Sequence, residues 1–393
     1  MIGTGTQTDP YIVSTLADLR TAAGTAGAYV VMDPDASTKI LDLNGSATNP
    51  VTQRLDINCA SLAGNGWRIR NLYFSSPSDH FLVSTTTAVT QVSDLHFDNL
   101  VCNNGAKSLL SMANTTLTGC SFTGVKYFAA EAYLLAAGSS THSMACKSCT
   151  FAMQAQGSGI PYGIATRCDF TDCNFMLDMP FTVESGRRVN LFSYSGLEDC
   201  LMRGSITLSG TGNGGLLYIT DGNKPMKNSF IAVEITNTSE YTIGLYPVKA
   251  TATSCIVKDL IGSGITYYNG DNIQYVAAAQ GKDAAYLNSV GFPVTEVCVM
   301  AWTLETNVNE GYPHNANSRY GNPGLVAPYP DGMWMIQPGV NDGYPHRSSF
   351  SQPETGLCLV YLGVKQPLKL YNGAEPVLAA YFGSVEVFRT GTS

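Results

Sequence analysis

Charged side chains are scarce in this chain: only 13% of its 393 residues are Asp, Glu, Lys or Arg, about half the share in an average soluble protein. The formal net charge is −8, from 22 basic and 30 acidic residues, and Arg187-Arg188 is the only basic doublet. Non-specific binding to nucleic acid needs a basic face. We therefore expect no nucleic-acid partner.

Long apolar runs are also missing. The longest, at residues 127–137, is interrupted by Glu131 and is too short to span a bilayer, so we expect no membrane insertion. The sequence opens Met1-Ile2-Gly3-Thr4, without the basic start and apolar core of a secretory signal. We expect a protein that is made in a cytoplasm and released by lysis.

What the sequence does contain is a repeat: a small or thiol residue, a spacer, and then Phe or another apolar residue. From Phe74 onward its last residues are separated by 23 to 29 positions. A period in this range indicates a solenoid, propeller or array, and the segments between carry turn residues and short β patterns. The sequence therefore predicts an all-β fold, a right-handed parallel β-helix. The copies are Leu95-His96-Phe97, Cys120-Ser121-Phe122, Cys149-Thr150-Phe151, Cys173-Asn174-Phe175, Cys200-Leu201-Met202, Asn228-Ser229-Phe230 and Cys255-Ile256-Val257.

Five of the 11 cysteines follow this repeat. Residues two apart in a strand share one face, so stacked coils should align the thiols with the phenylalanines inside the rod. Free cysteine packs as a small apolar residue, and a cytoplasm keeps it reduced. We expect buried thiols and no metal or redox site, including at the Cys146/Cys149 pair. The expected ladder is Cys120, Cys149, Cys173, Cys200 and Cys255.

The pattern divides the chain into four parts. We expect an N-terminal cap at residues 1–30, with a short helix whose N-cap is Ser14 or Thr15, since both residue types are good N-caps. Residues 31–290 predict the β-helix. Residues 291–350 predict a small β module, and residues 351–393 a C-terminal repeat.

The module at 291–350 contains a duplication. A segment from Trp302 to Tyr312-Pro313-His314 recurs 32 residues later, from Trp334 to Tyr344-Pro345-His346. Its Asn-Glu/Asp-Gly-Tyr-Pro core is typical of a tight turn closing a hairpin. The aromatic residues Trp302, Tyr312, Trp334 and Tyr344 are candidates for a sugar-stacking platform; alternatively, the tryptophans fill the module's core. His314 and His346 are candidate metal ligands around a threefold axis; alternatively, they are surface or hydrogen-bonding residues.

The last part repeats every ten residues, as Tyr361-Leu362-Gly363, Tyr371-Asn372-Gly373 and Tyr381-Phe382-Gly383, with Val377 and Val387 six residues after the second and third tyrosines. Over about 30 residues this stretch resembles the Y-x-G-x-x-x-V repeats near the ends of phage tail and baseplate proteins. The resemblance implies a bacteriophage or prophage virion protein with a pectate-lyase-like β-helix, and it implies a homotrimer.

Carboxylates that might act on polysaccharide gather in one part of the rod. β-Helices also house lyases and hydrolases, which use paired carboxylates or an Arg or Lys base. The alternative is that these are turn residues, which Asp favours. The outward positions after the repeat, Asp98, Thr123, Ala152, Met176 and Arg203, contain no stacked carboxylate pair. The candidates are Asp169, Asp172, Asp178, Glu184, Arg187 and Arg188.

The sequence favours a structural component of a phage virion, of the tail-fibre or baseplate type, located in the virion. We expect a homotrimer joined through the segment after residue 290, contacts with other virion proteins and with host surface polysaccharide, and no cofactor. The Gly-rich stretch at residues 210–215 lacks the Lys-Ser/Thr of a phosphate loop. The main alternative is a β-helical depolymerase of bacterial surface polysaccharide; a surface adhesin is a third option.

Overall fold

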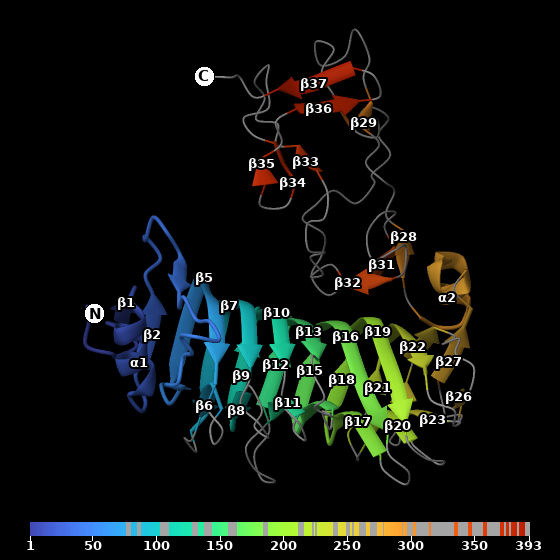
Figure 1. Cartoon of the computed structure of the whole chain (residues 1–393), viewed down its shortest axis with the longest axis horizontal. Helices are drawn as coiled ribbons and strands as arrows, with labels where there is room; N and C mark the ends of the chain where they lie inside the picture. Colours follow the sequence, from blue (N-terminus) through green and yellow to red (C-terminus); the bar gives the residue numbers. More distant parts are fainter. Residues whose placement is uncertain are drawn as a thin grey trace.

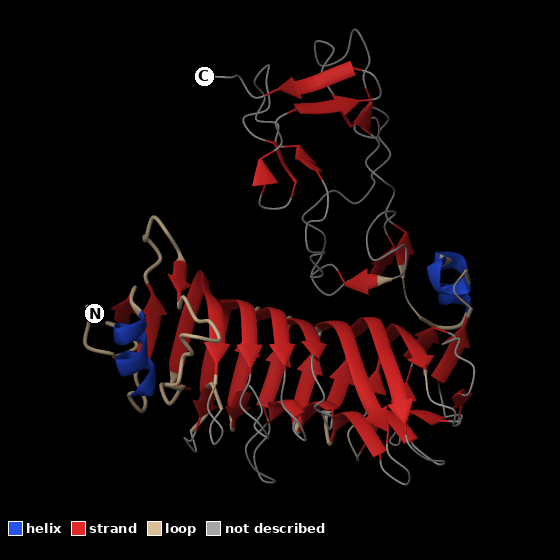
Figure 2. Cartoon of the chain, viewed as in Figure 1, coloured by secondary structure: helices blue, strands red, loops and turns tan. Residues whose placement is uncertain are grey.

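A computed structural model shows a three-sided parallel β-helix (Figures 1 and 2). Each coil contributes one strand to each of three ladders, and neighbouring coils pair in parallel. The predicted parallel β-helix is confirmed. The duplicated segment and the C-terminal repeat add short, mostly antiparallel pairs.

The structure describes most of the rod and short segments beyond it. These are residues 1–75, 80–84, 88–102, 110–127, 133–136, 144–155, 163–183, 188–210, 216–221, 224, 226–238, 243–248, 252–253, 255–258, 265–267, 273–277, 279–292, 294–296, 302–303, 314–315, 334–336, 345–347, 357–359, 370–372, 375–376, 379–382 and 385–389.

Two of the three ladders share the long strands β5 and β7, which turn a corner of the rod. The first ladder is made of β2 (Tyr29–Met32), β5 (Ser61–Phe74), β7 (Thr90–Cys102), β9 (Thr115–Thr118), β12 (Met144–Lys147), β15 (Cys168–Thr171), β18 (Gly196–Glu198), β21 (Met226–Lys227) and β24 (Ala252–Thr253). The second ladder is made of β3 (Ile40–Asp42), β5, β7, β10 (Ser121–Tyr127), β13 (Thr150–Ala155), β16 (Asn174–Val183), β19 (Leu201–Gly210), β22 (Phe230–Asn237), β25 (Cys255–Lys258) and β27 (Ile273–Val276).

The third ladder is a nine-stranded sheet. It is made of β4 (Leu55–Asp56), β6 (Leu82–Ser84), β8 (Leu110–Met112), β11 (Tyr133–Ala136), β14 (Gly163–Thr166), β17 (Arg188–Ser193), β20 (Leu216–Asp221), β23 (Ile243–Val248) and β26 (Ile265–Tyr267). After the rod come the helices η1 (Gln280–Lys282) and α2 (Ala284–Ser289), and then the strands β28 (Thr295–Glu296), β29 (Trp302–Thr303), β30 (His314–Asn315), β31 (Trp334–Ile336), β32 (His346–Arg347), β33 (Leu357–Leu359), β34 (Leu370–Asn372), β35 (Glu375–Pro376), β36 (Ala379–Phe382) and β37 (Val385–Arg389).

A short helix lies at the start of the rod, and its N-cap is Thr15, one of the two residues that the sequence suggests. Strand β1 (Tyr11–Val13) pairs with β2, and helix α1 (Leu16–Gly24) follows it. The Thr15 hydroxyl accepts a hydrogen bond from the backbone N–H of Asp18 at 3.2 Å, which caps the helix. Leu19, Ala22 and Ala23 are buried against the first coils. The cap thereby shields apolar groups that an open coil end would expose.

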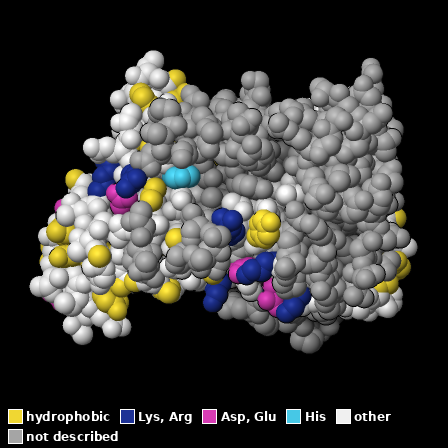
Figure 3. Space-filling view, turned by 90° about the horizontal axis from the view of Figure 1, so that it is seen from below, with side chains coloured by type: hydrophobic (Ala, Val, Ile, Leu, Met, Phe, Trp, Pro, Cys, Tyr) yellow, Lys and Arg dark blue, Asp and Glu magenta, His cyan; other side chains and the backbone are white. Residues whose placement is uncertain are grey.

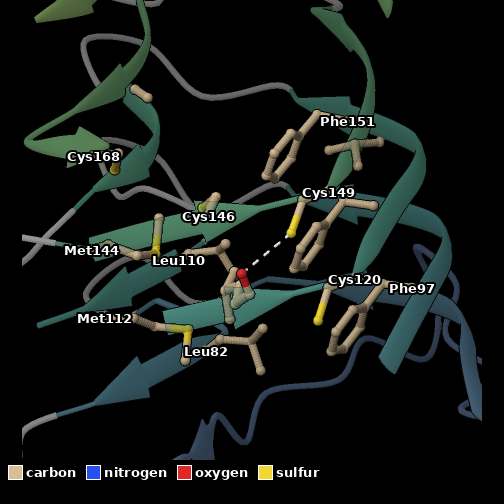
Figure 4. Packing of buried hydrophobic residues seen from close by; sticks show 14 of the residues in the cluster. Leu82, Phe97, Leu110, Met112, Cys120, Met144, Cys146, Cys149, Phe151 and Cys168 are labelled. Atoms are coloured by element: carbon tan, nitrogen blue, oxygen red, sulfur yellow. Dashed lines mark hydrogen bonds between the residues drawn. The ribbon is translucent and has the colours of Figure 1, made fainter. Parts of the chain in front are cut away.

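A column of stacked phenylalanines runs through the interior of the second ladder. The ring centroids of Phe97 and Phe122 are 4.9 Å apart, those of Phe122 and Phe151 5.5 Å, and those of Phe151 and Phe175 5.2 Å, with interplanar angles of 5°, 3° and 12°. All four rings are at most 2% exposed. Figure 4 shows Phe97 and Phe151 beside Cys120 and Cys149. The repeat therefore sets the interior register of the rod.

Two members of the predicted repeat are wrong. Phe97 pairs with Ile69, whereas Phe74 pairs with Cys102, so Ile69 and not Phe74 begins the interior column. The copy at residues 228–230 is also one residue out of register. Met202 pairs with Ile231, whereas Phe230 pairs with Leu201 and points outward. Consequently Ser229, and not Asn228, takes the position that cysteine holds in the preceding coils. Its hydroxyl donates to the carbonyl of Lys227 at 2.8 Å, so serine at this position still donates a hydrogen bond to the backbone, as the cysteine thiols do.

The corner between the first and second ladders has a repeated turn. In successive coils a residue with positive φ comes directly before a buried residue, which is Leu95 in the first of these coils and a cysteine or serine in the following five. The positive-φ residues are Asp94, Gly119, Ser148, Asp172, Asp199 and Asn228. The following thiol donates back across the turn, as from Cys149 Sγ to the carbonyl of Lys147 at 3.3 Å and from Cys173 Sγ to that of Thr171 at 3.3 Å. The thiols therefore satisfy corner carbonyls as well as filling the core.

The described cysteine side chains are expected to be unreactive in the native protein. All seven are buried and free of disulfides. Burial raises the pKa of Cys146 and Cys173, and that of Cys59 to about 12, so at pH 8 the reactive thiolate of these three is suppressed. For all seven, burial also keeps an alkylating reagent from reaching the sulfur. Alkylation at pH 8 followed by peptide mapping should leave these seven unlabelled until the protein is denatured. Native labelling of Cys120, Cys149, Cys173 or Cys200 would contradict the ladder; the side chain of Cys255 lies outside the described residues.

Candidate functional site

The outer face of the second ladder carries two rows of aligned side chains. One row contains Ala152, Met176, Arg203 and Ala232; the other contains Gln154, Asp178, Ser205 and Glu234. The rows are two residues apart along each strand, so they lie side by side on one face. The first row is largely apolar and the second is polar.

A groove of about 420 Å³ opens on this face. Its floor and walls come from strands β10, β13, β16 and β19. It is lined by Gly124, Val125, Ala152, Met153, Gln154, Met176, Leu177, Asp178, Arg203 and Gly204. The groove thus combines an apolar surface with one carboxylate, one amide and one guanidinium.

The groove begins where a β-bulge ends. Strand β10 places Gly124, with φ of 60°, as an extra residue opposite β13, and the register shifts between Phe122 and Val125. Strands β5 and β7 carry Asn71 and Asn99 at the matching place, also with positive φ. A bulge bends a strand and increases its twist. The change from bulged to regular coils therefore leaves a hollow at Gly124 and Ala152.

Asp178 is the carboxylate of the groove, and its neighbours on both sides hold it. Gln154 Nε2 donates to Oδ2 at 2.7 Å, and Ser205 Oγ donates to Oδ1 at 3.3 Å. A carboxylate oxygen can accept more than one hydrogen bond. Asp178 is therefore a fixed acceptor with capacity for hydroxyl groups of a ligand above it.

The structure separates the predicted carboxylate cluster. Asp169 points outward from the first ladder and pairs with Lys224 at 2.7 Å. Asp172 lies at the corner with φ of 54°, and only Asp178 lies in the groove. The side chains of Glu184, Arg187 and Arg188 lie outside the described residues. The three described carboxylates therefore lie at different places on the rod, and a catalytic role for any of them stays a prediction.

Gln154 and Ser205 were not predicted, although a signal for them exists. Each lies three residues after the interior residue of its coil, as Asp178 does after Phe175. Comparing that position across coils, and not only the position directly after the phenylalanine, predicts the polar row. Glu234, three residues after Ile231, belongs to the same row.

The second copy of the duplicated segment packs on the rod. Trp334 is 4% exposed and lies against Phe292, with ring centroids 4.9 Å apart. It therefore offers no open ring face for a sugar, which corrects its place in the predicted platform. The side chain of Trp302 and residues Tyr312 and Tyr344 lie outside the described residues.

His346 is buried and donates its Nδ1–H to the carbonyl of Arg347 at 3.0 Å. Burial lowers its pKa, so the ring is neutral at pH 7. The side chain of His314 lies outside the described residues, and among the side chains that the structure describes no group of three or more His, Cys, Asp or Glu could hold a metal ion.

The surface agrees with the scarcity of charge. On the face shown in Figure 3, basic and acidic side chains lie together in small groups. Within the described part of the chain, no helix is long and apolar enough to cross a membrane.

Comparison with known proteins adds one structure. No family model matches this chain, and no curated protein matches it. A candidate immunoglobulin A1 protease from Bacteroides ovatus aligns with a TM-score of 0.33 and 16% sequence identity, over 80% of this chain and 94% of that one. A likeness of this size supports no statement about activity.

Proposed function

We propose that this chain is a structural rod of a bacteriophage virion, of the tail-fibre or baseplate type, and that it contacts a host surface glycan through the groove on the second ladder. The groove is the observation that carries the proposal. Its floor of Met176 and Ala152 suits the C–H face of a sugar ring, and the Asp178 carboxylate beside it suits ring hydroxyls. The groove lies across successive coils, so an extended chain lying along the rod would meet it.

The resemblance of the C-terminal repeat to phage tail and baseplate proteins supports the virion assignment. A homotrimer formed through the segment after residue 290 belongs to the same proposal. Apart from the second hairpin, which packs on the rod, the short antiparallel pairs there, β29–β30, β33–β34 and β36–β37, are marginal by themselves in water, and burial between chains would stabilise them.

A depolymerase is the second candidate, and one observation favours it. Asp178 and Glu234 are aligned two coils apart with Ser205 between them, so their backbones are separated by roughly 9.5 Å, two strand spacings. Inverting glycosidases hold two carboxyl groups about 6.5–9.5 Å apart. The same experiment distinguishes binding from cleavage.

We expect the full chain to bind purified bacterial surface polysaccharides on a glycan array without releasing oligosaccharide. Asp178→Ala removes hydrogen bonds to a charged acceptor, worth about 1.5–3 kcal/mol, and should weaken binding about 10- to 100-fold. Asp169 is a carboxylate on the first ladder, outside the groove, so Asp169→Ala is the matched control and should bind normally. Equal binding by both variants would refute the groove as the glycan-binding site. If the protein releases reducing ends and Glu234→Gln abolishes that release, the depolymerase is established instead.

A further inference from the structure

The two copies of the duplicated segment form hairpins of the same register. In the first, Trp302 pairs with Asn315 and Thr303 with His314; in the second, Trp334 pairs with Arg347 and Met335 with His346. In both copies the tryptophan faces the residue thirteen positions later. The hairpins are therefore equivalent in backbone, and they differ at the position opposite the tryptophan, Asn315 or Arg347.

The second hairpin covers an apolar patch on the outside of the rod. Leu201, Phe230 and Ala232 point outward there and are nevertheless buried. Phe292, after helix α2, and Trp334 lie over Phe230 at ring centroid distances of 5.7 and 6.5 Å. The contact is of the kind that any tryptophan hairpin could make, since it depends on area and not on direction.

Arg347 adds a contact that depends on charge and position. Its Nε donates to Asp172 Oδ1 at 2.8 Å, and its Nη1 to Asp199 Oδ1 at 3.4 Å. Its guanidinium lies 5.4 Å from the centre of the Trp334 ring, in range for a cation–π contact. Arg347 is 6% exposed, and Asp172 and Asp199 are 16% and 27% exposed, so the docked hairpin removes both carboxylates largely from water.

These carboxylates mark one place along the rod. In the corner series of Asp94, Gly119, Ser148, Asp172, Asp199 and Asn228, acidic residues are adjacent only at Asp172 and Asp199. The apolar patch begins at Leu201, two residues after Asp199. Charge and apolar surface therefore coincide at a single height on the rod.

We propose that Arg347 selects which hairpin docks: the surface formed by Asp172, Asp199, Leu201, Phe230 and Ala232 accepts the second hairpin of this chain and excludes the first. Asn315 is neutral and shorter than arginine, so the first hairpin would bury the two carboxylates without a counter-charge. Removing one partner of a buried ion pair is strongly unfavourable, because the remaining charge stays out of water. The shared tryptophan gives affinity, and the arginine gives specificity.

The test uses tryptophan as the reporter in the full chain. Besides Trp67, which is buried in the rod and donates to the carbonyl of Asp33 at 2.8 Å, only Trp302 and Trp334 are present. In a Trp302→Phe background the second hairpin is observed, and in a Trp334→Phe background the first; Trp67 is a constant internal control for folding of the rod.

In the Trp302→Phe background, Arg347→Asn should raise acrylamide quenching of Trp334 several-fold, and Arg347→Lys should restore part of the shielding. In the Trp334→Phe background with Arg347→Asn, adding Asn315→Arg should shield Trp302. Unchanged shielding of Trp334 after Arg347→Asn would overturn the proposal, since the aromatic contact would then suffice. So would an Asn315→Arg variant without gained shielding, or shielding that is lost on dilution, which would place the hairpin on a second copy of the chain.

Discussion

Replacing Phe151 with Ala is expected to lower the free energy of unfolding by about 3–5 kcal/mol, a large share of the stability of a typical protein. The ring is fully buried between Phe122 and Phe175 and meets the edge of Phe170 at 5.8 Å and 89°. Its removal opens a cavity that the stacked neighbours cannot fill, because their own backbones are fixed by parallel pairing. In a solenoid each coil is stabilised chiefly by the coils next to it, so removing the ring should destabilise the coils on both sides.

Urea unfolding followed by circular dichroism measures this effect. Val89→Ala is the control: Val89 is 61% exposed, and its truncation should change the stability by no more than about 0.5 kcal/mol. A loss below about 1 kcal/mol for Phe151→Ala would contradict the phenylalanine column.

Gly204→Ala should be comparably damaging, with a cost of about 3 kcal/mol or more. Gly204 has φ of 109°, and a Cβ built on it would lie 2.0 Å from the carbonyl oxygen of Leu177. That oxygen belongs to the neighbouring strand of the second ladder, so relief would require the two strands to separate. Gly204 also lines the groove, and we expect the variant to lose glycan binding as well.

Gly119→Ala separates steric overlap from backbone strain. Gly119 also has a positive φ, 63°, but a Cβ there would meet nothing within 4 Å. Its cost should be limited to the left-handed conformation, about 1–2 kcal/mol. Thermal denaturation of Gly204→Ala and Gly119→Ala measures the two costs. An equal loss of stability in the two variants would show that the close approach at Leu177 has no effect.

The β-helix could be predicted because its cause is local and repeated. A large apolar residue recurs once per coil, as phenylalanine from Phe97 to Phe175 and then as Met202 and Ile231, because the interior of a rod imposes the same requirement each time. The misplaced copy at Phe230 shows the limit of that signal, since the period tolerates a shift of one residue. The corner between the ladders fixes the register of this copy, because there a positive-φ residue precedes a small hydrogen-bond donor. Asn228 has the positive φ, and the Ser229 hydroxyl donates to the corner carbonyl.

The candidate site was less predictable for a different reason. Asp178 could be singled out as a carboxylate, but its partners Gln154 and Ser205 lie 24 and 27 residues away, and only the exact coil register aligns them. The docking contact is more remote still: Arg347 and Asp172 are separated by 175 residues. Nothing local in either segment indicates its partner.

The docking of the second hairpin on the side of the rod also decides how mechanical tension would enter the protein. A pull applied at the last coil of a solenoid can peel coils away one after another, since each is held mainly by its neighbour. The docked contact instead runs from Asp172 before β16, past Asp199 before β19, to Phe230 in β22. Tension arriving through the hairpin is therefore divided among several coils at once, and the terminal coils are spared from bearing it alone.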